Sequence, residues 1–300
     1  MKQDITALIA LNRIFHFEPH LGYRLISALE AKGLSVEDFF LMEAKDRAEL
    51  LPLGAGKQPE QFLFAGKECL EQARQEYEEL SSLGIHFVTP DQFPEQLRNI
   101  HGAPLLLYMK SCSEPCFVFS HGMTAIVGTR DASPYGIHTT GTIAASLKDD
   151  PDCLHNCVVS GLALGIDTAA HRAALENGVH TVAVLPTGIT DSIYPHMNAG
   201  LAERIAETPG CALVTSFPPG TEPMALNFIA RNHIIAGLAN KIIIVESKAR
   251  GGGMVCARLA NDYGRDVYAV PGRIDDIRSA GCNQLIGNGI AKIITQNDLL

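Results

Sequence analysis

Four short segments carry the residues best suited to binding a phosphate. The first reads Gly128-Thr129-Arg130 and comes directly after an apolar run. Backbone N–H groups in a turn that opens a helix can receive an anion, and an arginine adds a bidentate contact to phosphate. The second and third glycines of the GxGxxG fingerprint are missing, so the turn predicts phosphate binding rather than a dinucleotide site. The alternative is an ordinary surface arginine on a strand-to-helix loop.

The second segment, SGLALGID, is another glycine-rich turn before a helical pattern. Ser160, Gly161 and Gly165 leave room for a ligand to approach the backbone. Asp167 and His171 follow, four residues apart on one helix face, a spacing that a general acid–base pair could use. An aspartate in the first turn of a helix also complements the helix dipole, and a nearby histidine can hydrogen-bond to it. We favour this structural interpretation of the pair.

The third segment, FIARNHIIAG, brings an aromatic ring and an arginine together. Phe228 lies three residues before Arg231, which is followed by Asn232. Proteins bind single-stranded nucleic acid by stacking bases on aromatic rings and by cationic contacts to the backbone. The three residues therefore suit one nucleotide of a single strand, with a core position for Phe228 as the alternative.

Three consecutive glycines distinguish the fourth segment. Lys248 and Arg250 precede Gly251, Gly252 and Gly253, and a helical pattern follows. Glycines lose more conformational entropy on folding than other residues. We therefore predict that this run lets a ligand or another backbone come close.

The sequence offers little for catalysis. It contains no nucleophile elbow, Walker lysine motif or zinc-protease helix. Cationic, glycine-lined turns without an acid–base constellation suit holding a phosphate chain better than reacting with it. We therefore expect a binding protein rather than an enzyme, and we expect no cofactor.

The cysteines raise the question of a metal site. Two cysteine pairs share one spacing and two histidines lie nearby: Cys112/Cys116, Cys153/Cys157, His121 and His155. If the strands that follow the two pairs are parallel neighbours, the pairs could meet at the amino edge of the sheet. The spacing is looser than that of zinc sites, and free cysteine is often simply buried. We therefore expect thiols, and neither a metal nor a disulfide.

The four segments belong to a longer alternation of apolar runs and helical patterns. Apolar runs that end at Gly, Pro or Ser are typical of strands buried on both faces. We expect strands at 124–128, 157–160, 181–188, 228–237, within 241–253 and at 266–272. We expect helices at 136–147, 165–178, 198–207 and 254–264, each followed by another apolar strand. Such alternation implies right-handed crossovers and a doubly wound α/β fold with a mostly parallel sheet. Its turns at the carboxyl ends of the strands form the expected binding edge.

The first quarter of the chain has a different pattern. Residues 5 to about 73 show apolar positions at three-and-four spacing, which predicts a small helical module, residues 1–75, before a sheet domain, residues 76–300. Part of the module is similar to helix–hairpin–helix or sterile-alpha-motif units. It has only Gly22 where a DNA clip needs hairpin glycines, so we favour packing against the next domain. Residues 76–119 predict one or two additional strands.

Composition and charge narrow the function further. The chain has 300 residues, 46% of them hydrophobic, and a net charge of −9. This net charge argues against a protein whose whole surface binds nucleic acid. It is compatible with a local basic groove, because arginines are enriched between 231 and 278. Neither a signal peptide nor a membrane-spanning stretch is recognisable, so we expect a cytoplasmic protein.

Taken in order, the motifs resemble the DprA (DNA processing protein A) or Smf family. The resemblance covers most of 125–300 and rests on IVGTR, SGLALGIDTAAH, FPPGTEP, RNHIIAGL, IIIVESKARGGG, GRDVYAVPG and GCNQLIGNG. It implies a Rossmann-like protein that binds single-stranded DNA in natural transformation (competence) and recombination, forms dimers through that domain and loads the RecA recombinase. Its motif residues fall here on Gly128, Thr129, Arg130, Ser160, Gly161, Gly165, Asp167, Phe228, Arg231 and Asn232.

The sequence departs from the family pattern at several positions. Where many members have Lys-Ser-Gly-Ser, this chain has Arg250 and three glycines, which removes two hydroxyl donors. His233 stands where a further cation is usual, which implies weaker or pH-dependent binding. Many members continue into a winged-helix domain, and the sequence leaves open whether this lineage does.

Two further expectations complete the sequence-based interpretation. A homodimer would use apolar residues from the last third: Met254, Val255, Leu259, Leu285, Ile286, Ile290, Ile293 and Ile294. The competing function is a nucleotide phosphoribohydrolase of the lysine-decarboxylase-like group, which carries PGGxGTxxE. Here FPPGTEP has Pro219 at a glycine position and Glu222 directly after Thr221, so that motif fails.

Overall fold

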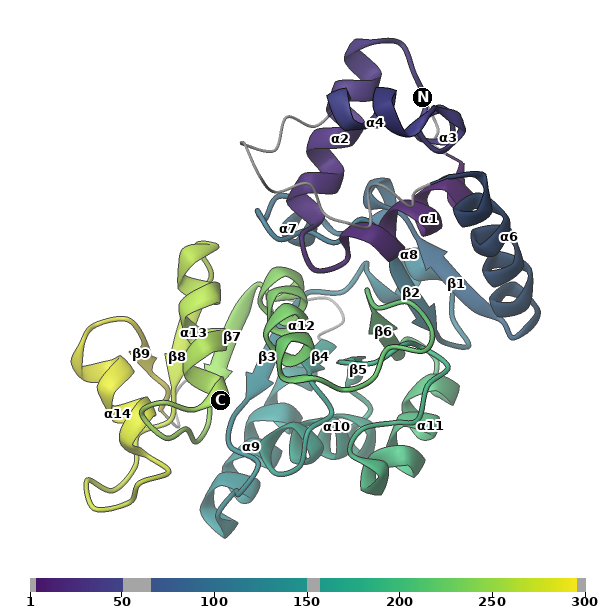
Figure 1. The fold of residues 1–300 in the computed structure, drawn as a ribbon. Helices are drawn as coiled ribbons and strands as arrows, with labels where there is room; N and C mark the ends of the chain where they lie inside the picture. The colour runs from purple at the N-terminus through teal and green to yellow at the C-terminus, as the bar shows by residue number, and fades with distance from the viewer. Residues whose placement is uncertain (1–3, 51–65, 150–156, 296–300) are drawn as a thin grey trace.

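A computed structural model describes residues 4–50, 66–149 and 157–295 (Figure 1). The strands are β1 (Ile85–Val88), β2 (Leu107–Lys110), β3 (Met123–Val127), β4 (Cys157–Ser160), β5 (His180–Val184), β6 (Ala212–Thr215), β7 (Lys241–Ile244), β8 (Asp266–Ala269) and β9 (Lys292–Ile293). Within the described residues these nine strands form one sheet, in the order β1-β2-β6-β5-β4-β3-β7-β8-β9. The strands from β6 to β9 pair in parallel, whereas β1 and β2 add to one edge in antiparallel fashion.

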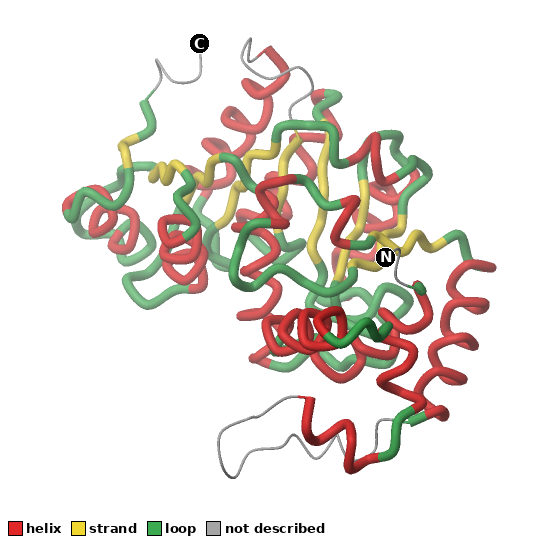
Figure 2. The backbone as a smooth tube through the Cα atoms, turned by 90° about the horizontal axis from the view of Figure 1, so that it is seen from above, coloured by secondary structure: helices red, strands yellow, loops and turns green. Residues whose placement is uncertain are grey.

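Helices cover both faces of the sheet. They are α1 (Ile5–Phe15), α2 (Pro19–Ala31), α3 (Val36–Leu41), α4 (Ala44–Leu50), α6 (Lys67–Ser82), α7 (Glu95–Arg98), α8 (Pro115–Val118), α9 (Pro134–Ser146), α10 (Ile166–Asn177), α11 (Ala199–Glu207), α12 (Ala225–Leu238), α13 (Gly252–Asp262) and α14 (Ala280–Gly287). Buried side chains of α12 and α13 pack against one face, and those of α9 and α10 against the other. The view from above shows strands between two layers of helices (Figure 2). The expected doubly wound α/β fold is confirmed.

The connections place a topological switch point beside β3. From β3 the chain proceeds outward through β4, β5 and β6, and then returns across the sheet to β7, which pairs with the other side of β3. Open α/β sheets bind ligands at the carboxyl ends of the strands where the winding reverses. The turns after β3 and β7 contain the first and fourth predicted segments, so the topology brings them together.

Two details of the sequence-based prediction differ from the structure. Residues 228–237, expected as a strand, lie in helix α12. The reason is the spacing of Ile234, Ile235 and Leu238, which put one face of a helix into the core. Strand β9 has only two residues and was not anticipated, whereas β1 and β2 confirm the two additional strands expected before residue 119.

The N-terminal helices pack directly on the antiparallel end of the sheet. Residues of α1, α2, α3 and α6 share one hydrophobic cluster with β1, β2, β5 and β6. At Gly22 of α2 a Cβ would lie 2.4 Å from Leu105 Cδ1, so glycine allows the helix to approach the loop before β2. This contact fits the expected packing role. Helix α6 crosses the predicted boundary at residue 75, and the division into two domains stays a prediction.

Candidate functional site

A cavity of about 380 Å³ opens at the switch point between β3 and β7. Most of the predicted binding residues line it: Gly128, Thr129, Arg130, Phe228, Arg231, Asn232, Lys248, Gly251, Gly252 and Gly253. They come from the turn after β3, from α12 and from the turn that opens α13. Ala163 and Asp167 of the second segment also line it, so the structure brings residues of all four predicted segments to one place.

The remaining predicted residues lie outside the wall of this cavity. Ser160 is buried at the end of β4 and donates its hydroxyl to the Ile126 carbonyl, 2.6 Å away. Gly165 has a φ of 75°, and a Cβ there would lie 2.4 Å from the Thr129 carbonyl oxygen, so this glycine supports the neighbouring turn. Arg250 is exposed beside the cavity. A role in binding for these residues stays a prediction.

Arg231 forms part of the inner wall. Only 5% of its surface is exposed, and its Nη1 donates to the Val184 carbonyl at 3.2 Å. Burial lowers the pKa of Arg231 and nearby Asp167 opposes that shift, while burial raises the pKa of Asp167 against the opposing effect of Arg231. The arginine Nε is buried and has no hydrogen-bond partner among the described residues.

Gly161, just outside the cavity, makes room for this guanidinium. A Cβ at residue 161 would lie 1.3 Å from Nη1 of Arg231. Any side chain there would displace the arginine. The sequence correctly indicated that another group lies close to Gly161. That group is the guanidinium of Arg231 in the same protein.

Phe228 is half-buried and stacks against cations. The guanidinium carbon of Arg130 lies 4.8 Å from the centre of its ring, and that of Arg231 lies 6.0 Å away. Tyr194 makes an edge-on contact with the same ring at 5.6 Å. Rings and guanidinium planes of this kind offer surfaces on which a base can stack. Tyr194 was not among the predicted residues, and only its exposure, 42%, marks it.

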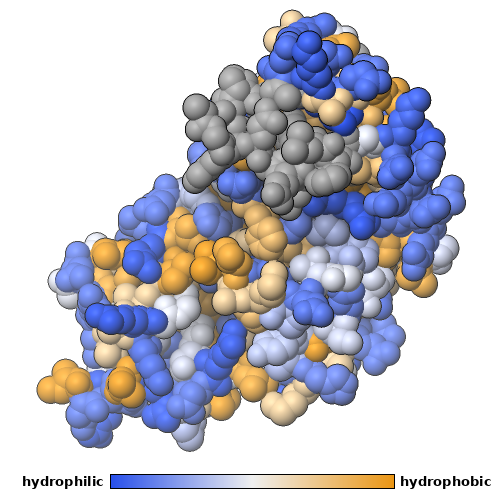
Figure 3. Space-filling view, in the orientation of Figure 1, coloured by the Kyte–Doolittle hydropathy of each residue, from blue (hydrophilic) through white to orange (hydrophobic). Residues whose placement is uncertain are grey.

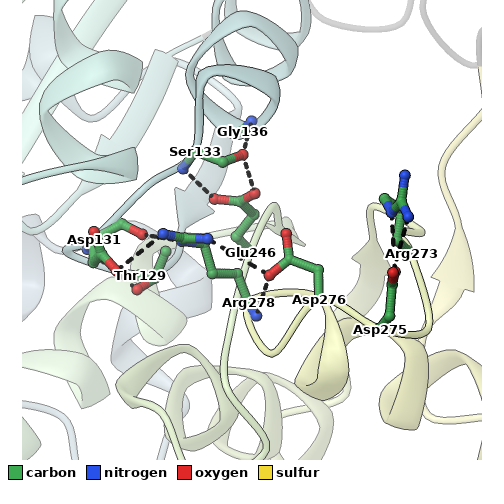
Figure 4. A network of polar contacts seen from close by, with 9 residues as sticks. All are labelled: Thr129, Asp131, Ser133, Gly136, Glu246, Arg273, Asp275, Asp276 and Arg278. Atoms are coloured by element: carbon green, nitrogen blue, oxygen red, sulfur yellow. Dashed lines mark hydrogen bonds and ion pairs between the residues drawn. The ribbon is translucent and has the colours of Figure 1, made fainter.

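The helix start nearest Arg130 is filled by the chain's own carboxylate (Figure 4). Glu246 accepts hydrogen bonds from Ser133 N at 2.9 Å and from Ser133 Oγ at 2.5 Å, and that hydroxyl caps Gly136 N at 3.0 Å. The Glu246 carbonyl also accepts from Thr129 N at 2.7 Å. The N-terminus of α9, expected to receive a ligand anion, is thus already occupied, although Arg130 itself still faces the cavity.

A second group of polar contacts ties the neighbouring turns together (Figure 4). Arg278 contacts the Asp131 carboxylate at 3.3 Å, and its Nε donates to the Asp131 carbonyl at 2.9 Å. Its own carbonyl accepts from Ser247 N at 2.7 Å. Because Asp131, next to Arg130, is paired with Arg278, its carboxylate repels an incoming phosphate less than an unpaired carboxylate would.

The start of α13 remains open. Gly251, its N-cap, provides no side-chain cap, and no acidic residue lies in the first turn. The first N–H groups of a helix have no intrahelical acceptor and favour an anion. Lys248 is exposed beside this terminus and, like Arg130, forms no ion pair within the described ranges. The buried Ser247, missed by the sequence-based prediction, adds a hydroxyl to the cavity wall.

His171 and Glu222, the residues of the acid–base and phosphoribohydrolase alternatives, lie outside the cavity. His171 is fully buried, with Nδ1 2.7 Å from Thr181 Oγ1, and burial lowers its pKa to about 3. Glu222 is exposed outside the cavity. Across the described part of the chain no three His, Cys, Asp or Glu side chains gather to hold a metal. Cys153 and His155 lie outside the described residues.

Fold and cavity together define an α/β protein of the doubly wound class with a cationic, glycine-lined site at its switch point. No helix in the described ranges is both long and apolar enough to cross a membrane. Residues 85–300 match the family described as DNA recombination-mediator protein A, and the chain belongs to this family. The expected membership in the DprA/Smf family is therefore confirmed.

Individual relatives support the assignment. DNA processing protein DprA of Streptococcus pneumoniae is 37% identical over 213 residues, which are 71% of this chain and 72% of the relative. Protein Smf of Synechocystis is 36% identical over 74% of this chain but only 55% of its own length. The X-ray structure of the Streptococcus pneumoniae protein superposes with a TM-score of 0.81 at 29% identity, covering 100% of this chain and 97% of that chain.

A second similar structure is that of a relative for which DNA binding is described. It is described as showing the single-stranded DNA binding mode of DNA processing protein A from Helicobacter pylori. It superposes with a TM-score of 0.62 at 28% identity, and covers 71% of this chain and 94% of that chain.

Proposed function

We propose that this protein binds single-stranded DNA in the cavity at the switch point, with phosphates at the start of α13 and a base on Phe228. The observation that carries the proposal is the meeting of an open helix terminus, an aromatic ring and exposed cations in one cavity. The binding described for the Helicobacter pylori relative supports the same ligand. A single strand fits because its backbone is flexible and its bases are free to stack.

Titration of a labelled oligothymidylate by fluorescence anisotropy tests this proposal. Binding should exceed that of a duplex of equal length and weaken as salt rises. Arg130→Ala should reduce the affinity about ten- to 150-fold, the effect of losing one hydrogen bond from a charged group. Arg172→Ala, which removes an exposed arginine of α10 outside the cavity, is the matched control and should bind normally. Equal affinity for duplex and single strand would refute the proposal.

We further propose that two copies of the chain bind one strand. Of the apolar residues expected at the interface, Met254 and Leu285 are buried in the core, but Ile290 and Ile293 are 36% and 48% exposed. Two cavities on one strand would raise the effective concentration of the second contact. Light scattering at micromolar concentration, with and without an oligonucleotide, should give twice the monomer mass. A monomer under both conditions would contradict the proposal.

The family assignment supports the remaining parts of the proposal, which are a cytoplasmic location, transfer of the strand to RecA during transformation and recombination, and no catalysis. Transfer should appear as faster strand exchange by RecA on DNA that this protein has covered.

Incubation with nucleoside mono- and triphosphates should release no base, sugar phosphate or phosphate. Turnover that Glu222→Gln abolishes would establish the competing phosphoribohydrolase function instead.

A further inference from the structure

A second, smaller pocket lies where the N-terminal helices meet α12. It has a volume of about 210 Å³ and is lined by residues of the α1–α2 turn and the start of α2, of the loop before β2, of the segment after β6 and of α12. Four of its side chains are imidazoles: His16, His20, His101 and His233. The rings of His20 and His101 are stacked, with their centres 5.4 Å apart and 28° between their planes. No function described above uses this pocket.

The pocket has no fixed charge. Its lining includes no Lys, Arg, Asp or Glu. Burial lowers the pKa of His16, although backbone hydrogen bonds with Asn12 and Arg13 oppose that shift. Burial also lowers the pKa of His233, and so does nearby His101. Burial therefore favours the neutral form of these two imidazoles, and a pocket without Lys or Arg suits an uncharged ring better than a phosphate.

Aromatic and apolar surface surrounds the imidazoles. Phe17 is 41% exposed, and its ring centre lies 4.3 Å from that of His16. Leu226 and Ile229 of α12 line the pocket and are 62% and 51% exposed. Figure 3 shows hydrophobic side chains gathered on the face toward the viewer, at the position of α12 in Figure 1. A flat ring would find stacking surfaces here together with ring nitrogens that donate or accept hydrogen bonds.

The pocket and the switch-point cavity lie on opposite faces of one helix. The residues of α12 that face the pocket are those at positions 226, 229, 230 and 233. Those that face the cavity are at positions 228, 231, 232 and 235. Half the circumference of a helix about 10–12 Å across is roughly 16–19 Å. At about 3.4 Å per stacked nucleotide, about five nucleotides cover that path.

We propose that this histidine-lined pocket binds one base of the DNA strand held in the switch-point cavity. The inference rests on the proposed single-strand binding and extends it to a second subsite. The N-terminal helices thereby contribute to DNA binding through the turn between α1 and α2. A side chain of a protein partner is the other occupant that such a ring-lined pocket would fit.

Oligothymidylates of two lengths separate the subsites. A strand of about four nucleotides fills the cavity alone, and one of about twenty reaches both sites. Ala230→Leu places a larger side chain in the pocket, and His20→Ala with His101→Ala removes one of its walls. Both variants should bind the long strand about five- to 150-fold more weakly, the range for one stacked base, and the short strand normally. Arg172→Ala, on α10 outside both sites, is again the control and should bind both lengths like the wild type.

The outcomes distinguish this inference from the proposed function. A wild-type protein that binds neither length refutes the proposed function. A wild type that binds both, with pocket variants that bind the long strand equally well, refutes the pocket and favours a protein partner. Equal losses at both lengths also refute a separate subsite, because the change would then act through α12.

Photo-crosslinking locates the base directly. Trypsin releases residues 14–24 as one peptide, cut after Arg13 and Arg24, and this peptide carries the α1–α2 turn. A long strand containing 4-thiothymidine should crosslink to it, and Ala230→Leu should remove that crosslink. Crosslinks confined to peptides of the switch-point cavity would overturn the proposal.

Discussion

Gly161→Ala is the substitution with the sharpest structural consequence. The φ angle of Gly161 lies outside the left-handed region, so alanine fits the backbone conformation itself. Its Cβ, however, would lie 1.3 Å from Nη1 of Arg231, whereas ordinary contacts begin near 3.4 Å. The guanidinium must therefore move by about 2 Å. That movement breaks its hydrogen bond to the Val184 carbonyl and takes it away from Asp167.

The size of the effect can be worked out from these contacts. A hydrogen bond from a charged group contributes about 1.5–3 kcal/mol. Replacing glycine by alanine restricts the unfolded chain and returns about 0.4–1 kcal/mol. The net loss in the free energy of unfolding should be about 0.5–2.5 kcal/mol. Binding of a single strand should also weaken, because Arg231 leaves the cavity wall.

Urea denaturation followed by circular dichroism measures the loss, and Gly141→Ala is the matched control. Gly141 lies inside α9 with no atom within 4 Å of a built Cβ, so alanine there should stabilise the protein by about 0.4–1 kcal/mol. The two variants should differ by about 1.5–3 kcal/mol. In an Arg231→Ala background Gly161→Ala should no longer destabilise, since the clash is gone. Equal stability changes at both glycines would refute the reasoning.

Further substitutions separate binding from stability. Lys248→Ala should lower the slope of log affinity against log salt by about 0.7, measured by anisotropy titration. Glu246→Ala should lower the free energy of unfolding by about 3 kcal/mol in urea denaturation, because two hydrogen bonds to a buried carboxylate are lost. Because burial lowers the pKa of His171 to about 3 from its usual 6.5, protonation favours the unfolded chain as pH falls through that window. Wild type should lose about 2 kcal/mol between pH 7 and 5 that His171→Gln retains; parallel pH profiles would contradict this.

The sequence was sufficient to predict the sheet and the turns that carry the site. Apolar runs ending at glycine identified β3, β4, β5, β7 and β8, and parallel topology placed the turns after β3 and β7 side by side. It failed where apolar spacing was ambiguous, as in α12, whose sequence also matches a buried strand. Periodicity in a short apolar segment does not distinguish these structures.

Long-range contacts account for the other differences. Arg231 was predicted to contact a nucleotide, and nothing in the sequence indicated its burial against the Val184 carbonyl, 47 positions away. Glu246 reaches Ser133 across 113 positions, so nothing local marks it as the cap of α9. The histidine-lined pocket likewise assembles from four distant segments, and no spacing pattern in the sequence predicts it.

The distribution of carboxylates explains how an acidic protein presents an anion site. At the switch-point edge Glu246 occupies the start of α9, and Asp167 lies in the first turn of α10 facing Arg231. A pyrophosphate at the start of α9 would have to displace a buried, hydrogen-bonded carboxylate, which disfavours the nucleotide mode of this fold. Only the start of α13, among these three helices, lacks both a cap and an acidic residue. This distribution supports the proposal that phosphate binds at the glycine run, from which an extended strand would continue along the cavity toward Phe228.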